Sequence, residues 1–274
     1  MNIWILSDIL AAAVLLIFVV PWIFRTILAY STVRQSAQPR FDPMGEESSN
    51  VPEDISRFFA SRERELKQLG FEVRGRYRVE HLTGKLDAFA LIFVAPAEKI
   101  AALAMALKVP PGLPVRNATV LHLVTRYGDG SALETMNSDR LRPFPPPKGR
   151  SVAQLPSVAD APTLLRVHRM LVQGRGETSS RTLRPAGADA EEDSALAAFS
   201  MTEAMKRQAE AGWTRLAEDF RFYRPTWKGA ALLSWNRLWP ISMIRLARIR
   251  ARERHLLSAA QAAGSKPDAQ AAPS

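Results

Sequence analysis

Histidines and carboxylates are the residues of this chain that could act as acids or bases near neutral pH. The four histidines stand singly, with no His-Glu-x-x-His or other metal-ligand spacing, and they are His81, His122, His168 and His255. Three carboxylates lie near expected turns without a recognisable partner, namely Asp87, Asp129 and Glu134. Neither a Gly-x-Ser-x-Gly motif nor a dinucleotide-binding glycine motif occurs. The sequence therefore predicts no catalytic residue, no metal site and no cofactor.

Tryptophans and arginines near the two ends of the chain indicate a different chemistry, which is contact with a membrane surface. Indole rings favour the headgroup level of a bilayer, and guanidinium groups are attracted to anionic headgroups. We therefore predict membrane-interface residues at both ends of the chain: Trp4, Trp22, Arg25, Trp235, Arg237, Trp239, Arg245, Arg248 and Arg252.

The N-terminal members of this set flank an apolar stretch, Ile3 to Phe24, that predicts a transmembrane helix. A bilayer needs about 20 apolar residues in one helix, and the one charge in this stretch, Asp8, lies near its end. A cleaved secretion signal would have a basic start and an apolar core of about 7–15 residues. No basic residue precedes this longer run. A helix of a soluble domain is rarely apolar on all sides over this length.

The charges around the apolar stretch predict its orientation. Arg25, Arg34 and Arg40 follow it, whereas no lysine or arginine precedes it. Positive residues close to a span stay on the cytoplasmic side. We therefore expect a single-pass protein of the cell membrane, with its N-terminus outside and its soluble domain in the cytoplasm.

The C-terminal members of the set lie in Gly229–Leu257, which predicts one amphipathic helix. Its apolar face would carry Leu232, Trp235, Trp239, Met243 and Leu246, and the four arginines of the set would lie opposite. Such segregation is typical of a helix that lies in the membrane interface. Three alternatives stay open: a second span interrupted by Arg237 and Arg245, a helix docked on the domain, and a nucleic-acid contact.

The chain between these ends predicts an α+β domain. One helix is expected from Pro52 to Gly70, another after the capping residue Asp160, and a long amphipathic one from Glu191 to about Asp219. Residues that alternate between apolar and polar, or are rich in β-branched side chains, predict strands at 71–80, 86–94, 118–127 and 132–137. Residues 100–109 suit either a helix or a strand, and their place after a short proline-containing turn favours a strand. The result is an antiparallel sheet of about five strands covered by helices.

The net charge of +10 is concentrated outside the domain. Residues 41–227 carry 26 basic and 24 acidic side chains, whereas residues 228–274 carry eight basic and two acidic ones. A nucleic-acid-binding domain normally has a basic face, so this distribution argues against nucleic acid and favours anionic lipid as the partner. The chain has no cysteine, which excludes disulfides, thiolate metal sites and a cysteine nucleophile.

These patterns divide the chain into five parts. They are a transmembrane anchor (1–28), a flexible linker (29–50), a soluble α+β domain (51–227), a basic tryptophan-bearing amphipathic helix (228–258) and a disordered tail (259–274). We expect a non-enzymatic scaffold or partner-binding domain held at the bilayer, with an unidentified protein as a possible partner. A membrane-proximal hydrolase or transferase that uses His122 or His168, and a ligand-sensing domain, are the alternatives.

Overall fold

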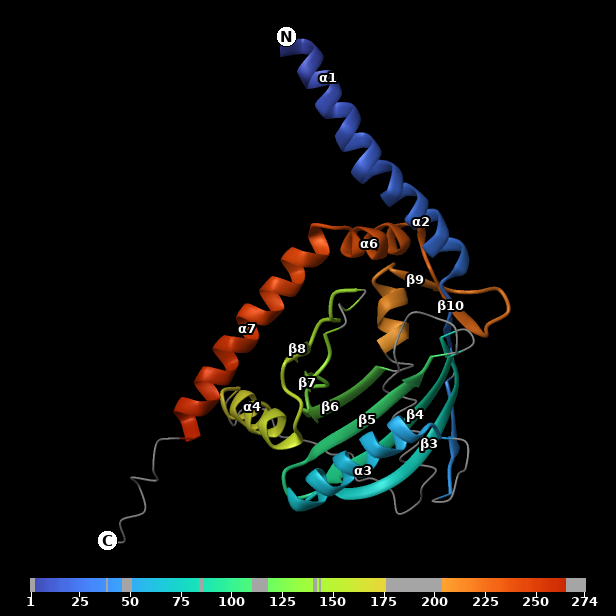
Figure 1. Cartoon of the computed structure of the whole chain (residues 1–274). Helices are drawn as coiled ribbons and strands as arrows, with labels where there is room; N and C mark the ends of the chain where they lie inside the picture. Colours follow the sequence, from blue (N-terminus) through green and yellow to red (C-terminus); the bar gives the residue numbers. More distant parts are fainter. Residues whose placement is uncertain are drawn as a thin grey trace.

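A computed structural model describes residues 3–37, 39–45, 51–83, 86–109, 118–139, 142, 144–175 and 204–264 (Figure 1). It begins with one continuous helix made of α1 (Ile3–Val14), a π-helical segment η1 (Leu15–Val19) and α2 (Val20–Thr32). Pro21 has no N–H to donate to the carbonyl of residue 17, and the wider π-turn lies where that bond is missing. Helix α1 contacts mainly η1, and η1 contacts mainly α1 and α2. This half of the helix therefore projects away from the rest of the chain.

Ordered structure continues past the N-terminal helix into the segment expected to be a flexible linker. Strand β1 (Gln35–Ser36) pairs with β10, and β2 (Arg40–Pro43) pairs with β3. Phe41 is buried, and its ring lies 5.9 Å from that of Tyr77. Residues 29–37 and 39–45 are therefore part of the fold rather than a spacer, and residues 46–50 lie outside the described part of the chain.

The main sheet has seven strands in the order β2-β3-β4-β5-β6-β7-β8. The strands that follow β2 are β3 (Glu72–Thr83), β4 (Leu86–Ala95), β5 (Ile100–Lys108), β6 (Ala118–Arg126), β7 (Ala132–Met136) and β8 (Arg150–Gln154). The expected strands all form, including the ambiguous one at 100–108. The prediction of about five antiparallel strands is nevertheless wrong, because β2 and β8 add to the sheet and β8 runs parallel to β7.

Two helices bury one face of this sheet. Helix α3 (Glu53–Gln68) begins after Pro52 and has Glu53 and Asp54 in its first turn, as predicted. Helix α4 (Ala161–Gln173) begins at Asp160, whose carboxylate accepts a hydrogen bond of 2.7 Å from the N–H of Thr163. The core between helices and sheet is apolar, with members such as Leu66, Phe93, Leu121, Leu164 and Leu165. The expected α+β arrangement is thus present, in a mixed sheet.

The long helix expected from Glu191 to Asp219 is wrong in its C-terminal half. Residues 204–210 are helical, but Gly212 has a φ of +73° and ends the helix. The chain then forms β9 (Thr214–Leu216) and β10 (Phe222–Pro225), which make a three-stranded sheet with β1. Trp213 leaves the expected helical stripe and stacks on the buried ring of Phe144 at 6.3 Å. The first part of the expected helix, residues 191–203, lies outside the described residues.

The expected single C-terminal helix is also wrong, because it is two helices. They are α6 (Trp227–Arg237) and α7 (Ile241–Gly264), and the bond between them, Trp239–Pro240, is cis. Proline disfavours helical backbone in the residue before it, so Pro240 separates the two. Helix α7 continues six residues into the expected tail, whose remaining residues, 265–274, are not described.

Gly229 allows α6 to approach the start of β9 closely, which gives a first prediction. A Cβ atom at this position would lie 1.8 Å from the carbonyl oxygen of Trp213, an oxygen that also accepts the N–H of Thr226. We expect Gly229→Ala to lower the free energy of unfolding of the full chain by about 1–3 kcal/mol, because overpacking forces the backbone apart. Urea unfolding in detergent measures this. Gly45→Ala, which has no atom within 4 Å of its Cβ, is the control and should change little.

Candidate membrane-facing site

Helix α6 packs along the second half of the N-terminal helix, in the opposite chain direction. Tyr30 meets Trp227 with 5.8 Å between ring centroids, and Trp22 meets Trp235 with 6.4 Å. The indole N–H of Trp22 donates to the carbonyl of Ala231 at 3.1 Å. Thr26, between these contacts, is only 1% exposed. Residues 22–32 are therefore held by the domain, whereas α1 and η1 are not.

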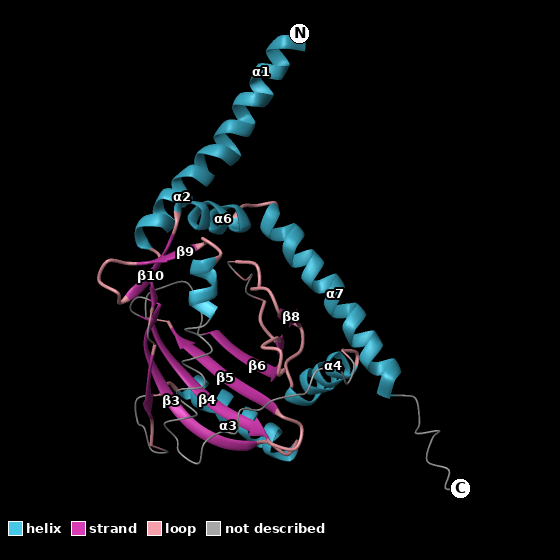
Figure 2. Cartoon of the chain, turned by 180° about the vertical axis from the view of Figure 1, so that it is seen from behind, coloured by secondary structure: helices cyan, strands magenta, loops and turns pink. Residues whose placement is uncertain are grey.

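Large apolar side chains are exposed around the base of the projecting helix. Figures 1 and 2 show α6 lying across this base and α7 running from its end down to α4. Trp235 on α6 and Trp239 at the break are exposed, the latter to 67%, and Met243 and Ile244 on the first turn of α7 are exposed as well. Together with Ile23, Phe24 and Ile27 of α2 they place apolar surface beside the free helix. We call these seven residues the apolar rim.

The predicted membrane-interface residues fall into three groups. Trp4 is exposed near the far end of α1. Trp22, Arg25, Trp235, Arg237 and Trp239 come together at the base, where Arg25 Nη1 donates to the carbonyl oxygen of Arg237 at 3.4 Å. Arg245, Arg248 and Arg252 lie on α7, which runs from the end of α6 down to α4.

Helix α7 is held against the domain along its length. Glu253 is buried, and one of its carboxylate oxygens accepts both the N–H and the hydroxyl of Ser157, at 2.7 and 2.8 Å. Leu256 and Ala260 belong to the core under α4. Arg245 donates to the carbonyl of Arg142 at 3.2 Å, and burial lowers the pKa of the Arg245 guanidinium. Of the alternatives for the C-terminal helix, docking on the domain describes α7, whereas α6 lies at the base of the N-terminal helix.

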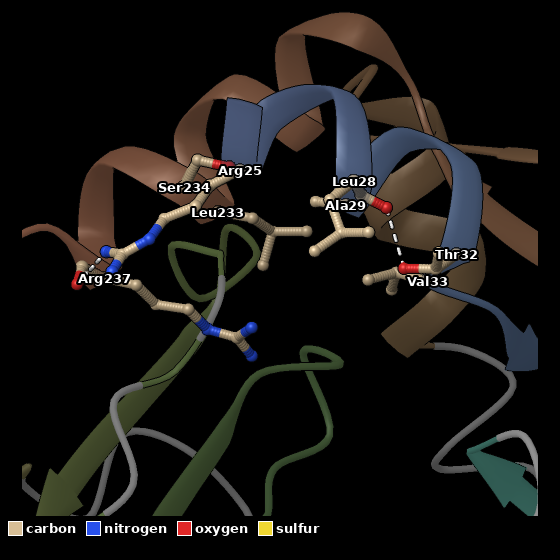
Figure 3. A pocket seen from close by; sticks show the side chains of 8 residues that line it. All are labelled: Arg25, Leu28, Ala29, Thr32, Val33, Leu233, Ser234 and Arg237. Carbon is tan, nitrogen blue, oxygen red and sulfur yellow. Dashed lines mark hydrogen bonds between the residues drawn. The ribbon is translucent and has the colours of Figure 1, made fainter. Parts of the chain in front are cut away.

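A pocket of about 400 Å³ lies between α2 and α6 (Figure 3). Arg25 reaches along one side of it to the carbonyl of Arg237, and the guanidinium of Arg237 points into the space below α2. The other lining side chains are mostly apolar: Leu28, Ala29, Thr32, Val33, Leu233 and Ser234. The pocket therefore combines two positive charges with an apolar wall.

A second group of charges is buried in the sheet, around Glu134 of β7. Its carboxylate lies 3.1 Å from Arg150 of β8, 3.4 Å from His122 of β6 and 3.5 Å from Arg142. Burial raises the pKa of Glu134, but the contact with His122 and the charges of His122, Arg142 and Arg150 outweigh it and lower this pKa from 4.5 to about 2. Glu134 is 3% exposed, so this is a buried ionic cluster.

The Glu134 cluster does not resemble a general acid–base pair. A carboxylate with a pKa of about 2 is a weak base and is never protonated near neutral pH, so it could neither accept nor supply a proton efficiently. His168, the other histidine singled out, is fully buried between the hydroxyls of Thr125 and Thr135, each 2.9 Å away. Both histidines therefore have structural partners. Within the described residues, no group of three or more metal-ligating side chains occurs.

No protein-family model, no curated protein and no solved structure matches this chain. Among the described helices, one segment, Leu15–Thr32, is long and apolar enough to cross a membrane, and a signal sequence would share these properties. What distinguishes the two is how this helix is joined to the rest of the fold.

Proposed function

We propose that the chain is a single-pass membrane protein whose α+β domain is held directly against the bilayer by the α2–α6 pair, where it acts as a non-enzymatic scaffold or partner-binding module. The observation that carries the proposal is the packing of Trp22, Thr26 and Tyr30 on α6, which makes the base of the apolar helix part of the folded domain.

The packing on α6 favours a permanent anchor over a removable signal. Cleavage near residue 30 would take away the partners of Trp227 and Trp235 and the buried Thr26. It would also cut next to β1, which pairs with β10. A signal sequence leaves without cost to the mature fold, whereas losing this segment would expose one side of α6.

The length of the free helix suits a bilayer. Ile3 to Pro21 would span about 28 Å at 1.5 Å per residue, close to the hydrocarbon thickness of about 30 Å. Trp22 and Trp235 then lie at the headgroup level, where indole is favoured. The apolar rim would enter the interface at the same level, which gives its exposed side chains an apolar environment.

The orientation in this proposal follows from the arginines. Arg25 follows Trp22 along α2 and donates to the carbonyl oxygen of Arg237, and positive residues close to a span stay in the cytoplasm. The N-terminus would be outside the cell membrane. A reporter fused after Ser274 that is active only on the outer side would contradict this orientation.

An enzymatic function is the weaker proposal, because His168 and Glu134 are buried groups with partners inside the fold, and His122 contacts Glu134. Scaffolding requires only that a surface of the domain be presented at the membrane. The described domain can be presented in this way, because the three-stranded sheet β1-β10-β9 and helix α7 both attach it to the α2–α6 pair.

A second prediction is that the apolar rim contacts lipid. Fluorescent labels on single cysteines test it. The chain contains no cysteine, so Met243→Cys carries one environment-sensitive fluorophore without further changes. In phosphatidylcholine nanodiscs we expect its emission to shift to the blue and to be quenched by lipids with nitroxide-labelled acyl chains. His255→Cys, exposed about three turns further along α7, should show neither effect. Equal quenching at both positions, or none at Met243→Cys, would contradict the proposal.

A further inference from the structure

The pocket between α2 and α6 has a chemical character that membrane attachment alone does not require. We propose that it binds a phosphate group, with Arg237 and Arg25 as the charged donors. Phosphate binding by this pocket does not require the proposed function to be correct, because either a phospholipid headgroup or a soluble phosphate compound could supply the phosphate group.

The charges of the two arginines lie close together on α2 and α6. Several arginines of the domain are paired with acids, as in the contacts Arg62–Glu65, Arg76–Glu63, Arg78–Asp87, Arg150–Glu134 and Arg169–Glu98. Within the described part of the chain, neither Arg25 nor Arg237 forms an ion pair, although the two lie in one pocket. Like charges at such a site repel each other, and an anion between them would remove that repulsion.

The geometry presents these donors to a shared ligand. The hydrogen bond from Arg25 to the carbonyl of Arg237 occupies one N–H and fixes the guanidinium, which leaves other N–H groups free of partners among the described residues. Figure 3 shows the Arg237 guanidinium pointing into the pocket from α6, whereas Arg25 reaches it from α2. Ser234 is 2% exposed and adds a hydroxyl to the wall that has no hydrogen-bond partner within the described residues. Guanidinium groups match the planar pairs of oxygens that a phosphate offers.

The apolar wall narrows the class of ligand. Leu28, Val33 and Leu233 line the same space, and their low polarity strengthens the attraction between guanidinium and phosphate. A volume of about 400 Å³ exceeds what a free phosphate ion fills, so the wall suits a phosphate ester with an apolar or glycerol portion. The pocket begins one helical turn from Trp22, at the level where headgroup phosphates lie in the proposed orientation.

The experiment uses the full chain in a non-ionic detergent and compares two sources of phosphate. Native mass spectrometry with added phosphatidylglycerol or phosphatidylcholine reports retained lipid, and calorimetric titration with inorganic phosphate or glycerol phosphate reports the soluble anion. The pocket variants are Arg237→Gln and Arg25→Gln. Arg64→Gln, at an exposed position of α3, removes the same charge outside the pocket and is the matched control.

We expect the wild-type chain and Arg64→Gln to bind phosphate in at least one of these forms, and the two pocket variants to bind it roughly tenfold or more weakly, since each loses charged hydrogen bonds. Binding of phosphatidylglycerol alone identifies a lipid headgroup as the source, and binding of the soluble anion identifies a free phosphate compound. No binding of either form, or an equal loss in Arg64→Gln, overturns the inference. Unchanged thermal unfolding of the pocket variants excludes misfolding as the cause.

Discussion

Replacing Glu134 by glutamine should lower the free energy of unfolding by about 3–5 kcal/mol, because it leaves buried cations without their counter-charge. Arg150, whose side chain is 9% exposed, has Glu134 as its acidic partner at 3.1 Å, and His122 and Arg142 share the same carboxylate. This position joins β6, β7 and β8, so its loss affects the edge at which the sheet changes from antiparallel to parallel.

The same cluster predicts how stability depends on pH. The pKa of Glu134 is lowered from 4.5 to about 2, so the folded state favours the charged form. The stability that this provides is fully present above the unfolded-state pKa of 4.5 and is lost as the pH falls toward 2. The shift corresponds to roughly 3 kcal/mol. Wild-type stability should therefore fall between pH 5 and pH 2, and this part of the fall should be absent in Glu134→Gln.

Urea unfolding of the full chain in detergent, followed by circular dichroism at several pH values, measures both effects. Glu98→Gln is the control, because Glu98 pairs with Arg169 on the surface and exposed pairs contribute only about 0–1 kcal/mol. A loss in Glu134→Gln no larger than that in Glu98→Gln would show that the cluster is solvated and contributes little.

Part of the Glu134 cluster could be deduced from the sequence. The Gly128-Asp129-Gly130 turn predicts a hairpin, and the structure confirms it with the bond from Tyr127 to Ser131. In that register Val124 faces Glu134, so His122 and Glu134 are diagonal neighbours on one face of the sheet. Both residues stand out in the sequence, but no local pattern pairs them.

Other features depend on contacts that no local pattern encodes. Strand β8 has five residues after a proline-rich segment, and only its parallel pairing with β7 brings Arg150 to Glu134. The short strand β1 likewise depends on a distant partner, because it pairs with β10 across more than 180 residues of chain, whereas β9 and β10 pair locally. The division between α6 and α7, by contrast, had a local signal in Pro240, which the amphipathic pattern of the arginines and tryptophans obscured. Periodicity thus predicted the central sheet and helices, whereas the site at the base of α2 required tertiary structure.

Two arginines in the middle of the projecting helix should remove the chain from the membrane. Leu16 and Ile17 of η1 are 63% and 62% exposed and contact no other element extensively, so lipid is their proposed environment. An arginine near the centre of a span costs about 2.5–3.5 kcal/mol, and the double variant Leu16→Arg/Ile17→Arg combines two such costs. We expect the wild-type chain to resist extraction of membranes with alkaline carbonate, and the double variant to appear in the soluble fraction.

The fold explains why this variant isolates the role of the helix. Because η1 lies outside the α2–α6 contacts, the released chain should keep Trp22 packed on α6 and unfold thermally like the wild type. Ala247→Arg/Ala251→Arg places the same charges on the exposed side of α7 and should stay in the membrane. If Leu16→Arg/Ile17→Arg also resisted carbonate, the apolar rim alone would hold the domain and the helix would not be the anchor. If instead the mature wild-type chain were soluble and lacked its first thirty or so residues, the helix would be a signal and the proposed function would fail.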